Sequence, residues 1–251
     1  MDFLEAIKEQ EIYLKTPQNA SICEPFFFEC ERIVQIAEQY KNEQASLVEE
    51  RTAETFIVQY AVGGENLHRG FYNPSPTYDL TIGNCNRGKI LSRITSRSKI
   101  SYEYNFDTNH NLLLIRKSPH SELETFEALI GKQNEIIGIT FDRFNKLRQV
   151  TECLYEDGQI SQYINCMFSL SEIAVSNYQK EVYRYSNNQL TSTDYYEFLP
   201  DIKLLNHSRT IFTHDTDGYL STYQVEYFQG EEISKNAKDE NVYTINIRRR
   251  A

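Results

Sequence analysis

The chain has 251 residues, 40% of them hydrophobic, and carries a formal net charge of −10. This length suits one β-rich domain with a core, and the negative charge disfavours nucleic acid and anionic membranes as partners. No apolar run approaches the roughly 20 residues that a membrane-spanning helix needs, and the acidic N-terminus lacks the basic and apolar regions of a signal peptide. We therefore expect a cytoplasmic protein.

The first fifty residues favour helices. Residues 3–11 place apolar side chains on one face of a 3.6-residue period, and the polar segment 16–19, which contains a proline, is expected to end that helix. A second helix is predicted to open near Pro25, because proline is tolerated in a first turn, and to run to about Glu50. Its apolar stripe comprises Phe26, Cys30, Ile33, Ala37 and Tyr40.

The same segment holds most of the negative charge. Residues 1–50 contain eleven acidic and four basic side chains, so their net charge is 4 − 11 = −7. Such a surface attracts basic partners, although an acidic helix surface more commonly serves solubility. The candidate contacts for a basic partner are Glu38, Glu43, Glu49 and Glu50.

The period changes at residue 55, where apolar side chains begin to alternate and predict a strand up to residue 62. Two prolines make 71–76 a loop. The one basic run, residues 87–99, places its cations at odd positions, so on a strand they share one face. Such a face is most often solvated, and the alternative is contact with phosphate or an acidic partner. The candidate anion contacts are Arg87, Lys89, Arg93 and Arg97.

A degenerate unit recurs between about residues 78 and 228. It contains an aromatic residue, an acidic or amide residue, an Asn/Gly-type turn and an aliphatic residue, most clearly at 102–112, 139–147, 154–160, 183–190 and 212–220. Each copy has the chemistry of a β-hairpin, because Asn, Asp and Gly tolerate the positive φ that tight turns require. We predict antiparallel strands with turns near Asn109, Asn145, Gly158, Asn188 and Gly218.

Two further segments carry their own signals. Ser121 and Glu124 have the spacing of a helix capping box. With the apolar residues at 126, 129 and 130, they predict a helix over 119–130. Residues 242–247 alternate as a last strand.

Motifs for catalysis or metal binding are missing from the sequence. The five cysteines include no Cys-x-x-Cys pair and the five histidines no i, i+4 pair, so we expect reduced, buried thiols, no metal and no cofactor. A Gly-x-Ser-x-Gly elbow and a phosphate-binding loop are absent, and the paired carboxylates fall at turn positions. The chain has 18 tyrosines, which commonly pack in cores but also recognise partners. Tyr195 and Tyr196 are the candidate partner contacts on the sheet.

The recurring unit resembles the YD repeat of Rhs-type proteins, in which tandem hairpins wind into a β-shell around a toxin. The closest copies are 102–112, 139–147 and 212–220. The resemblance implies the hairpin geometry but not the encapsulating function, because the chain is short and only Gly88, Gly158 and Gly218 keep the turn glycine. In size, charge and lack of a catalytic motif, the chain is also similar to small acidic bacterial immunity proteins, which neutralise toxins.

We therefore expect an α+β protein, in which acidic helices in residues 1–50 pack on a large twisted antiparallel β-meander formed by residues 51–251. The leading functional hypothesis is a non-catalytic protein-binding module of the immunity type, which occludes a basic toxin or nuclease after charge-steered encounter. One alternative is an enzyme or small-ligand-binding protein with a pocket at one end of the sheet. Another is a structural hairpin-repeat fragment of a surface or secretion-system protein.

Overall fold

The computed structural model describes residues 17–62, 89–95, 98–132, 134–169, 173–200, 204–216, 220–229, 232–233 and 242–244. These residues form two helices and fourteen strands, and the strand pairings are antiparallel. The chain divides into two compact units, one formed by residues 1–30 with 176–251 and one by residues 31–175. The expected combination of N-terminal helices with antiparallel hairpins is confirmed.

The helical boundaries differ from the prediction. Helix α2 (Pro17–Tyr40) continues through Pro25, and helix α3 (Gln44–Ala53) follows after a break at 41–43. The expected start near Pro25 and the expected break at 16–19 are therefore wrong for the described residues from 17 onward. A proline inside a helix costs a backbone hydrogen bond, but here the flanking residues are held by tertiary packing. Cys30, Ile33 and Ala37 of the predicted stripe are buried, as expected. Residues 3–11 lie outside the described residues.

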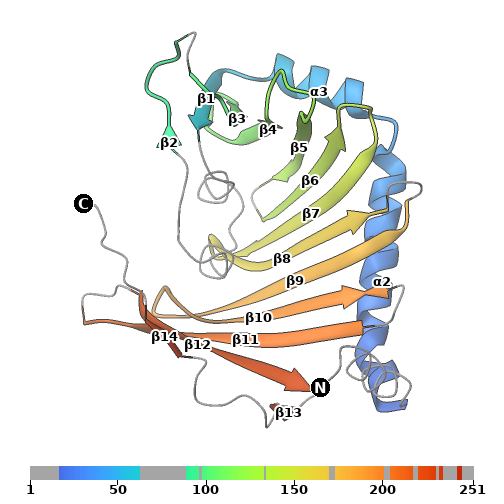
Figure 1. Cartoon of the computed structure of the whole chain (residues 1–251), viewed down its shortest axis with the longest axis vertical. Coiled ribbons are helices and arrows are strands. Elements are labelled where there is room, and N and C mark those ends of the chain that lie inside the picture. The colour runs from blue at the N-terminus through green and yellow to red at the C-terminus, as the bar shows by residue number, and fades with distance from the viewer. Residues whose placement is uncertain are drawn as a thin grey trace. The chain divides into compact units, whose positions relative to one another are not determined.

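Residues 31–175 contain strands in the order β2-β1-β3-β4-β5-β6-β7-β8, and from β3 onward each strand pairs with the next along the chain (Figure 1). Helix α3 packs on β4 and β5. The predicted strand over 55–62 is confirmed as β1. The bounds are β1 Ile57–Val62, β2 Lys89–Ile90, β3 Tyr102–Phe106, β4 Leu112–Lys117, β5 Thr125–Lys132, β6 Glu135–Asp142, β7 Leu147–Glu156 and β8 Gln159–Phe168.

The other unit contains β9-β10-β11-β12-β13 in chain order, with β14 also paired to β12. Phe26 of α2 packs in this unit against the rings of Tyr178, Tyr196 and Phe198, at centroid distances of 5.8, 5.4 and 6.0 Å. Strand β14 confirms the start of the predicted last strand. The bounds are β9 Val175–Ser186, β10 Gln189–Leu199, β11 Leu204–His214, β12 Leu220–Gln229, β13 Glu232–Ile233 and β14 Val242–Thr244.

One kind of hairpin turn is closed by an aspartate. The Asp107 carboxylate accepts hydrogen bonds from the backbone N–H groups of Asn109 and Asn111, both at 2.8 Å. Asp142 makes the same two bonds, at 2.8 and 3.0 Å, to the second and fourth residues after it. The third residue after Asp107 is His110, which takes a φ of 62°. The aspartate side chain thus holds the five-residue loop in one conformation.

The second kind of turn has two residues, both with positive φ. Asp157 and Gly158 have φ values of 51° and 77°, and Asn187 and Asn188 have 51° and 62°. Such turns match the twist of the flanking strands. The predicted turn near Gly218 lies outside the described residues. The predicted turns near Asn109, Asn145, Gly158 and Asn188 are confirmed.

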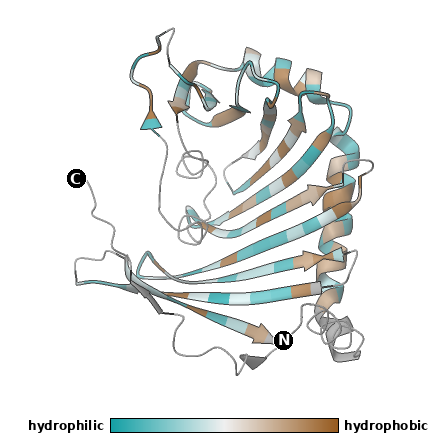
Figure 2. Ribbon diagram, in the orientation of Figure 1, coloured by the Kyte–Doolittle hydropathy of each residue, from teal (hydrophilic) through white to brown (hydrophobic). Residues whose placement is uncertain are grey.

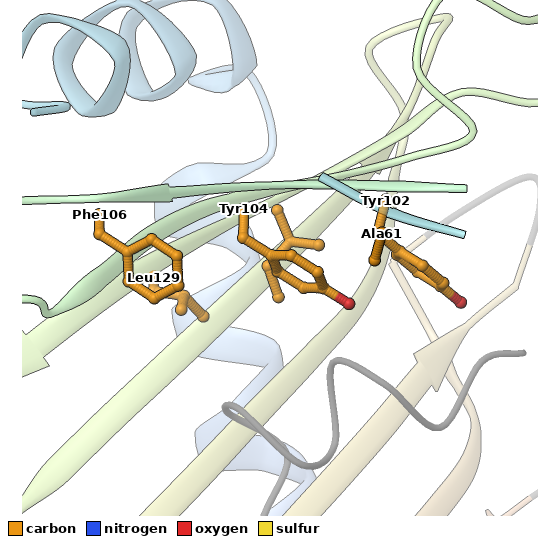
Figure 3. Close-up of a cluster of buried hydrophobic side chains, with 6 residues drawn as sticks. Ala61, Tyr102, Tyr104, Phe106 and Leu129 are labelled. Carbon is orange, nitrogen blue, oxygen red and sulfur yellow. The ribbon is translucent and has the colours of Figure 1, made fainter. Parts of the chain in front are cut away.

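Hydrophilic and hydrophobic residues alternate along several of the long strands (Figure 2), and successive side chains of a strand point to opposite faces. Tyr102, Tyr104 and Phe106 point to the same side of β3 and form a buried cluster with Ala61 and Leu129 (Figure 3). The intervening residues of β3 face the other way. This cluster therefore ties β1, β3 and β5 together on one face.

Two predicted elements are wrong. Residues 119–124 form turns and residues 125–132 form strand β5, where a helix was expected. The apolar positions fit both periods, and pairing with β4 and β6 decides in favour of the strand. In the described part of the basic run, residues 89–95 and 98–99, only Lys89 and Ile90 form a strand, β2, because residues 91–95 and 98–100 leave the ladder. The expected loop at 71–76 lies outside the described residues.

Candidate functional site

The glutamates chosen as partner contacts lie on the surface of the two helices. Glu43, Glu49 and Glu50 are exposed on α3 and the turn before it, and Glu38 is exposed near the end of α2, where it pairs with Lys41. All of them belong to residues 31–175. They lie off the buried stripe, so folding leaves their carboxylates in solvent.

The charge on α3 is only partly balanced. The Arg51 guanidinium contacts Glu50 Oε1 and Glu54 Oε2, each at 2.7 Å. Residues 43–54 contain four carboxylates and this one cation, a net charge of 1 − 4 = −3. Exposed ion pairs contribute only about 0 to 1 kcal/mol each, so the helix surface keeps an outward negative field.

The two tyrosines chosen as partner contacts lie on opposite faces of β10, because successive strand residues point in opposite directions. Tyr196 stacks on His207, with ring centroids 4.3 Å apart. Burial raises the pKa of Tyr195, and the nearby carboxylates of Glu197 and Glu181 raise it further. A single flat contact can therefore include one of these tyrosines but not both.

The structure describes two of the four basic residues chosen as anion contacts, and no strand joins those two. Lys89 is exposed on β2, and Arg93 lies in a bend after it. Arg87 and Arg97 lie outside the described residues. The shared face predicted from their odd spacing required a continuous strand, and β2 stops at Ile90.

A cleft of about 1230 Å³ opens at one end of the strands within residues 31–175. It arises because β4 and β5 pair only from Leu114↔Ala128 to Lys117↔Thr125, whereas β5 pairs with β6 as far as Lys132↔Glu135. The two strands separate beyond Leu114 and leave an opening between them. Its apolar lining includes Leu112, Leu113, Leu129, Ile130 and Ile136.

The rim of this cleft is polar. Arg51 and Glu54 line one part of it, and the β3–β4 turn with Asp107 and His110 lines another. Hydrogen bonds from the Asn111 side chain and from backbone N–H groups lower the pKa of Asp107. The Asp107 carboxylate is thus ionised and hydrogen-bonded within its own turn. The cleft combines an apolar floor with fixed polar edges.

The most deeply buried charge lies in the other unit. Asp194 on β10 has no exposed surface, and three basic side chains surround its carboxylate. Arg209 Nε donates to Oδ1 at 2.7 Å, Arg184 contacts Oδ2, and His207 Nε2 lies 3.4 Å from Oδ1. Burial favours the neutral acid, but hydrogen bonds from these three residues outweigh it and hold the pKa of Asp194 far below its usual range.

An aromatic ladder flanks this carboxylate. The His207 ring lies between Tyr196 and Phe228, at centroid distances of 4.3 and 4.2 Å and interplanar angles of 12° and 17°. The register explains the stack, because Tyr196, His207 and Phe228 are directly opposite one another on β10, β11 and β12. Sequence reasoning missed this cluster. The only local signal is the spacing of His207 and Arg209, which places both on one face of β11.

The cysteines do not supply a nucleophile in the described residues. Cys23, Cys30, Cys153 and Cys166 are free and buried. Burial raises the pKa of Cys30 to about 12, and burial is also the main cause of the raised pKa of Cys153. Thiols in such surroundings stay protonated and unreactive. The same parts of the chain contain no group of three or more His, Cys, Asp or Glu residues placed to hold a metal ion.

Comparison of the chain with protein-family models, with characterised proteins and with solved structures finds no match. In the segments that the structure describes, neither helix is both long and apolar enough to cross a bilayer.

Proposed function

We propose that the protein is a non-catalytic protein-binding module of the immunity type, which occludes a basic toxin or nuclease. The observation that supports this most is the exposed glutamate surface, which we define as Glu38, Glu43, Glu49 and Glu50. Three of these glutamates lie on helices and Glu43 lies directly before α3, so the backbone fixes the spacing of the carboxylates. Charge of one sign on a fixed surface accelerates the encounter with a partner of opposite sign.

Helix α3 is held firmly enough to present these carboxylates. Leu47 is buried, and Gln44 Nε2 donates a hydrogen bond to the Asp142 carbonyl oxygen at 3.0 Å. A binding surface that is ordered beforehand loses less entropy when its partner docks. The glutamate surface therefore suits rapid and durable occlusion of a basic substrate-binding surface.

Charges elsewhere are used to hold the fold. The buried Glu152 pairs with Arg32, and the buried Asp194 is enclosed by Arg184 and Arg209. These groups are already neutralised by their neighbours. Glu38 and Glu50 also have basic neighbours, but these pairs are exposed and residues 43–54 keep a net negative charge, and this favours the exposed glutamates over the buried acids as the contact.

The test compares two charge-reversed variants. The first carries Glu43→Lys, Glu49→Lys and Glu50→Lys. Its matched control carries Glu122→Lys, Glu135→Lys and Glu156→Lys, which changes the net charge equally at exposed sites outside α3 in the same unit. The partner is isolated from source cells with the wild type as bait, and association rates are measured at low and high salt.

We expect the α3 variant to associate about tenfold more slowly than the wild type at low salt, with convergence near 1 M salt, where the screening length is about 3 Å. The control variant should keep most of the wild-type rate. Equal rates for the wild type and the α3 variant at low salt would remove α3 from the contact and contradict the proposal.

The cleft supports a second candidate function, the binding of a small or extended ligand at one end of the sheet. Its volume slightly exceeds that of most small-molecule pockets, which hold about 300 to 1,000 Å³, and it joins an apolar floor to polar edges. The chain lacks tryptophan, so Leu112→Trp places a single fluorescent reporter in the cleft and narrows it. A ligand that raises the wild-type melting temperature should lose that effect in the variant, and an unchanged effect would exclude the cleft.

A further inference from the structure

Two apolar side chains at the start of β1 remain in solvent. Phe56 is 72% exposed and Val58 is 42% exposed. They alternate with Ile57 and Ala61, which pack in the buried cluster around Tyr104. Because side chains alternate along a strand, Phe56 and Val58 lie on the opposite face of β1 from that cluster.

Their exposure is not the result of a loose chain end. The Phe56 N–H donates to the Phe106 carbonyl oxygen at 2.8 Å, and β1 then pairs with β3 from Ile57 to Ala61. The main strand contacts of helix α3 are with β4 and β5, further into the sheet. The two apolar side chains are thus held in place by the backbone ladder while their surface stays open.

Negative charge lies directly beside this pair. A single residue, Thr55, separates Phe56 from Glu54, and Glu50 lies one helical turn before Glu54. Because each residue spans at most about 3.5 Å, the Cα atoms of Glu54 and Phe56 lie no more than about 7 Å apart, and both side chains are exposed. Both glutamates are exposed, and Arg51 between them is only 17% exposed.

An apolar centre with a charged rim is the anatomy of a protein interface. Isolated exposed apolar residues are ordinary on protein surfaces, but Phe56 and Val58 are held by the backbone ladder and follow directly in the chain two exposed glutamates that share the single Arg51 cation. Aromatic residues in such positions commonly account for most of the binding energy, whereas the charges around them govern the encounter.

We infer that Phe56 and Val58 form the apolar anchor of a docking surface whose charged rim is Glu50 and Glu54, and that its occupant is a basic protein segment with apolar side chains between Lys or Arg residues. The inference rests on the proposed function and adds the feature that would set affinity. A second copy of this chain fits less well, because a symmetric contact brings the same glutamates together.

Two labelled synthetic peptides serve as probes, one of alternating Lys and Leu and one of alternating Lys and Ser. Their dissociation constants are measured by fluorescence anisotropy with the wild type and with Phe56→Ser. The matched control is Phe144→Ser, because Phe144 is 67% exposed in the same unit but lies in the turn after β6. Both substitutions affect exposed side chains, so the fold should survive, and circular dichroism checks this.

We expect the wild type to bind the Lys–Leu peptide more tightly than the Lys–Ser peptide. Phe56→Ser should raise the dissociation constant of the Lys–Leu peptide about tenfold and leave that of the Lys–Ser peptide unchanged. Phe144→Ser should change neither. The α3 charge variant, with its glutamates reversed, should weaken both peptides.

The outcomes separate the inference from the proposed function. If Phe56→Ser leaves the preference for the Lys–Leu peptide unchanged, or if Phe144→Ser reduces that preference equally, the anchor is overturned. In either case the glutamate surface still stands if the α3 variant weakens the binding of both peptides. If the α3 variant and its control weaken the peptides equally, the glutamate surface fails. A wild-type dimer in sedimentation that Phe56→Ser dissociates would identify the patch as a self-contact and overturn the inference.

Discussion

The guanidinium of Arg32 on helix α2 donates two hydrogen bonds to the carboxylate of Glu152 on strand β7, with N–O distances of 2.6 and 2.7 Å. The carboxylate is almost fully buried, whereas the arginine side chain is 43% exposed. The two residues are 120 positions apart in the chain. The pair therefore fastens the helix to the sheet within residues 31–175 through a contact that exists only in the folded state.

Removing one partner of the Arg32–Glu152 pair should lower the free energy of unfolding more than removing both partners does. Arg32→Ala leaves a buried carboxylate without its guanidinium, and because water can reach the site of the arginine, we expect a loss of about 2 kcal/mol in unfolding free energy. The double variant Arg32→Met with Glu152→Met should lose less. Urea unfolding measures both, and a double variant less stable than the single one would contradict this account.

Asp194 should make the free energy of unfolding depend on pH in the acidic range. Its lowered pKa means that the folded state favours the carboxylate more than the unfolded state does, so the contribution is complete above the ordinary pKa of about 4 and is lost as pH falls below it. At pH 7, Asp194→Asn should lower the unfolding free energy by about 2 kcal/mol or more. The difference between wild type and variant should shrink between about pH 4 and pH 2.

The stability of the variant has to be subtracted from that of the wild type because Asp107 and Asp142 also have lowered pKa values. Their protonation in acid destabilises both proteins. Urea midpoints at a series of pH values provide the comparison. A difference that stays constant from neutral to acidic pH would show that the Asp194 charge is not what the three basic neighbours stabilise.

A substitution at Gly158 measures backbone strain separately from side-chain clashes. The φ of Gly158 is +77°, and a Cβ added there meets no atom within 4 Å. Gly158→Val should therefore destabilise through backbone strain alone, by about 1 to 2 kcal/mol. Gly158→Asn should recover most of the loss, because asparagine tolerates positive φ. Thermal unfolding measures both, and equal midpoints for the wild type and the valine variant would contradict the turn geometry.

Burial should protect the thiols. The chain has five cysteines, and the four that the structure describes are buried. With Ellman's reagent near pH 8 we expect at most one thiol to react rapidly in the native protein and all five to react in urea, because the thiolate is the reactive form and burial suppresses it. Rapid reaction of two or more thiols in the native state would contradict this packing.

The hairpins were predictable because their information is local. The spacing from Phe106 through Asp107 to Leu112 repeats from Phe141 through Asp142 to Leu147, and in both copies the aspartate closes the turn with its own carboxylate. Turn chemistry of this kind acts within a few residues. Strand positions and turns therefore follow from the sequence even though the copies are degenerate.

The misjudged elements depended on partners distant in sequence. The apolar residues at 126, 129 and 130 suit a helix or a strand equally, and only pairing with β4 and β6 selects the strand. Pro25 is retained inside α2, where the next residue, Phe26, packs on Tyr178 and Phe198.

The sequence anticipated only one residue of the docking surface that we propose. Glu50 was among the candidate partner contacts, whereas Glu54 was not, and the exposure of Phe56 is known only from the fold. The Asp194 cluster required the register of three strands, which no local pattern specifies.

The contact of Glu29 with Lys180 at 2.6 Å joins residues 151 positions apart. A ribosome adds about 5 to 20 residues per second, so the start of α2 waits roughly 8 to 30 seconds before its own sheet strands emerge. During that time Phe26 lacks the rings of Tyr178 and Phe198 that finally cover it. The unit made of residues 1–30 and 176–251 is therefore completed later in synthesis than the consecutive hairpins of residues 31–175.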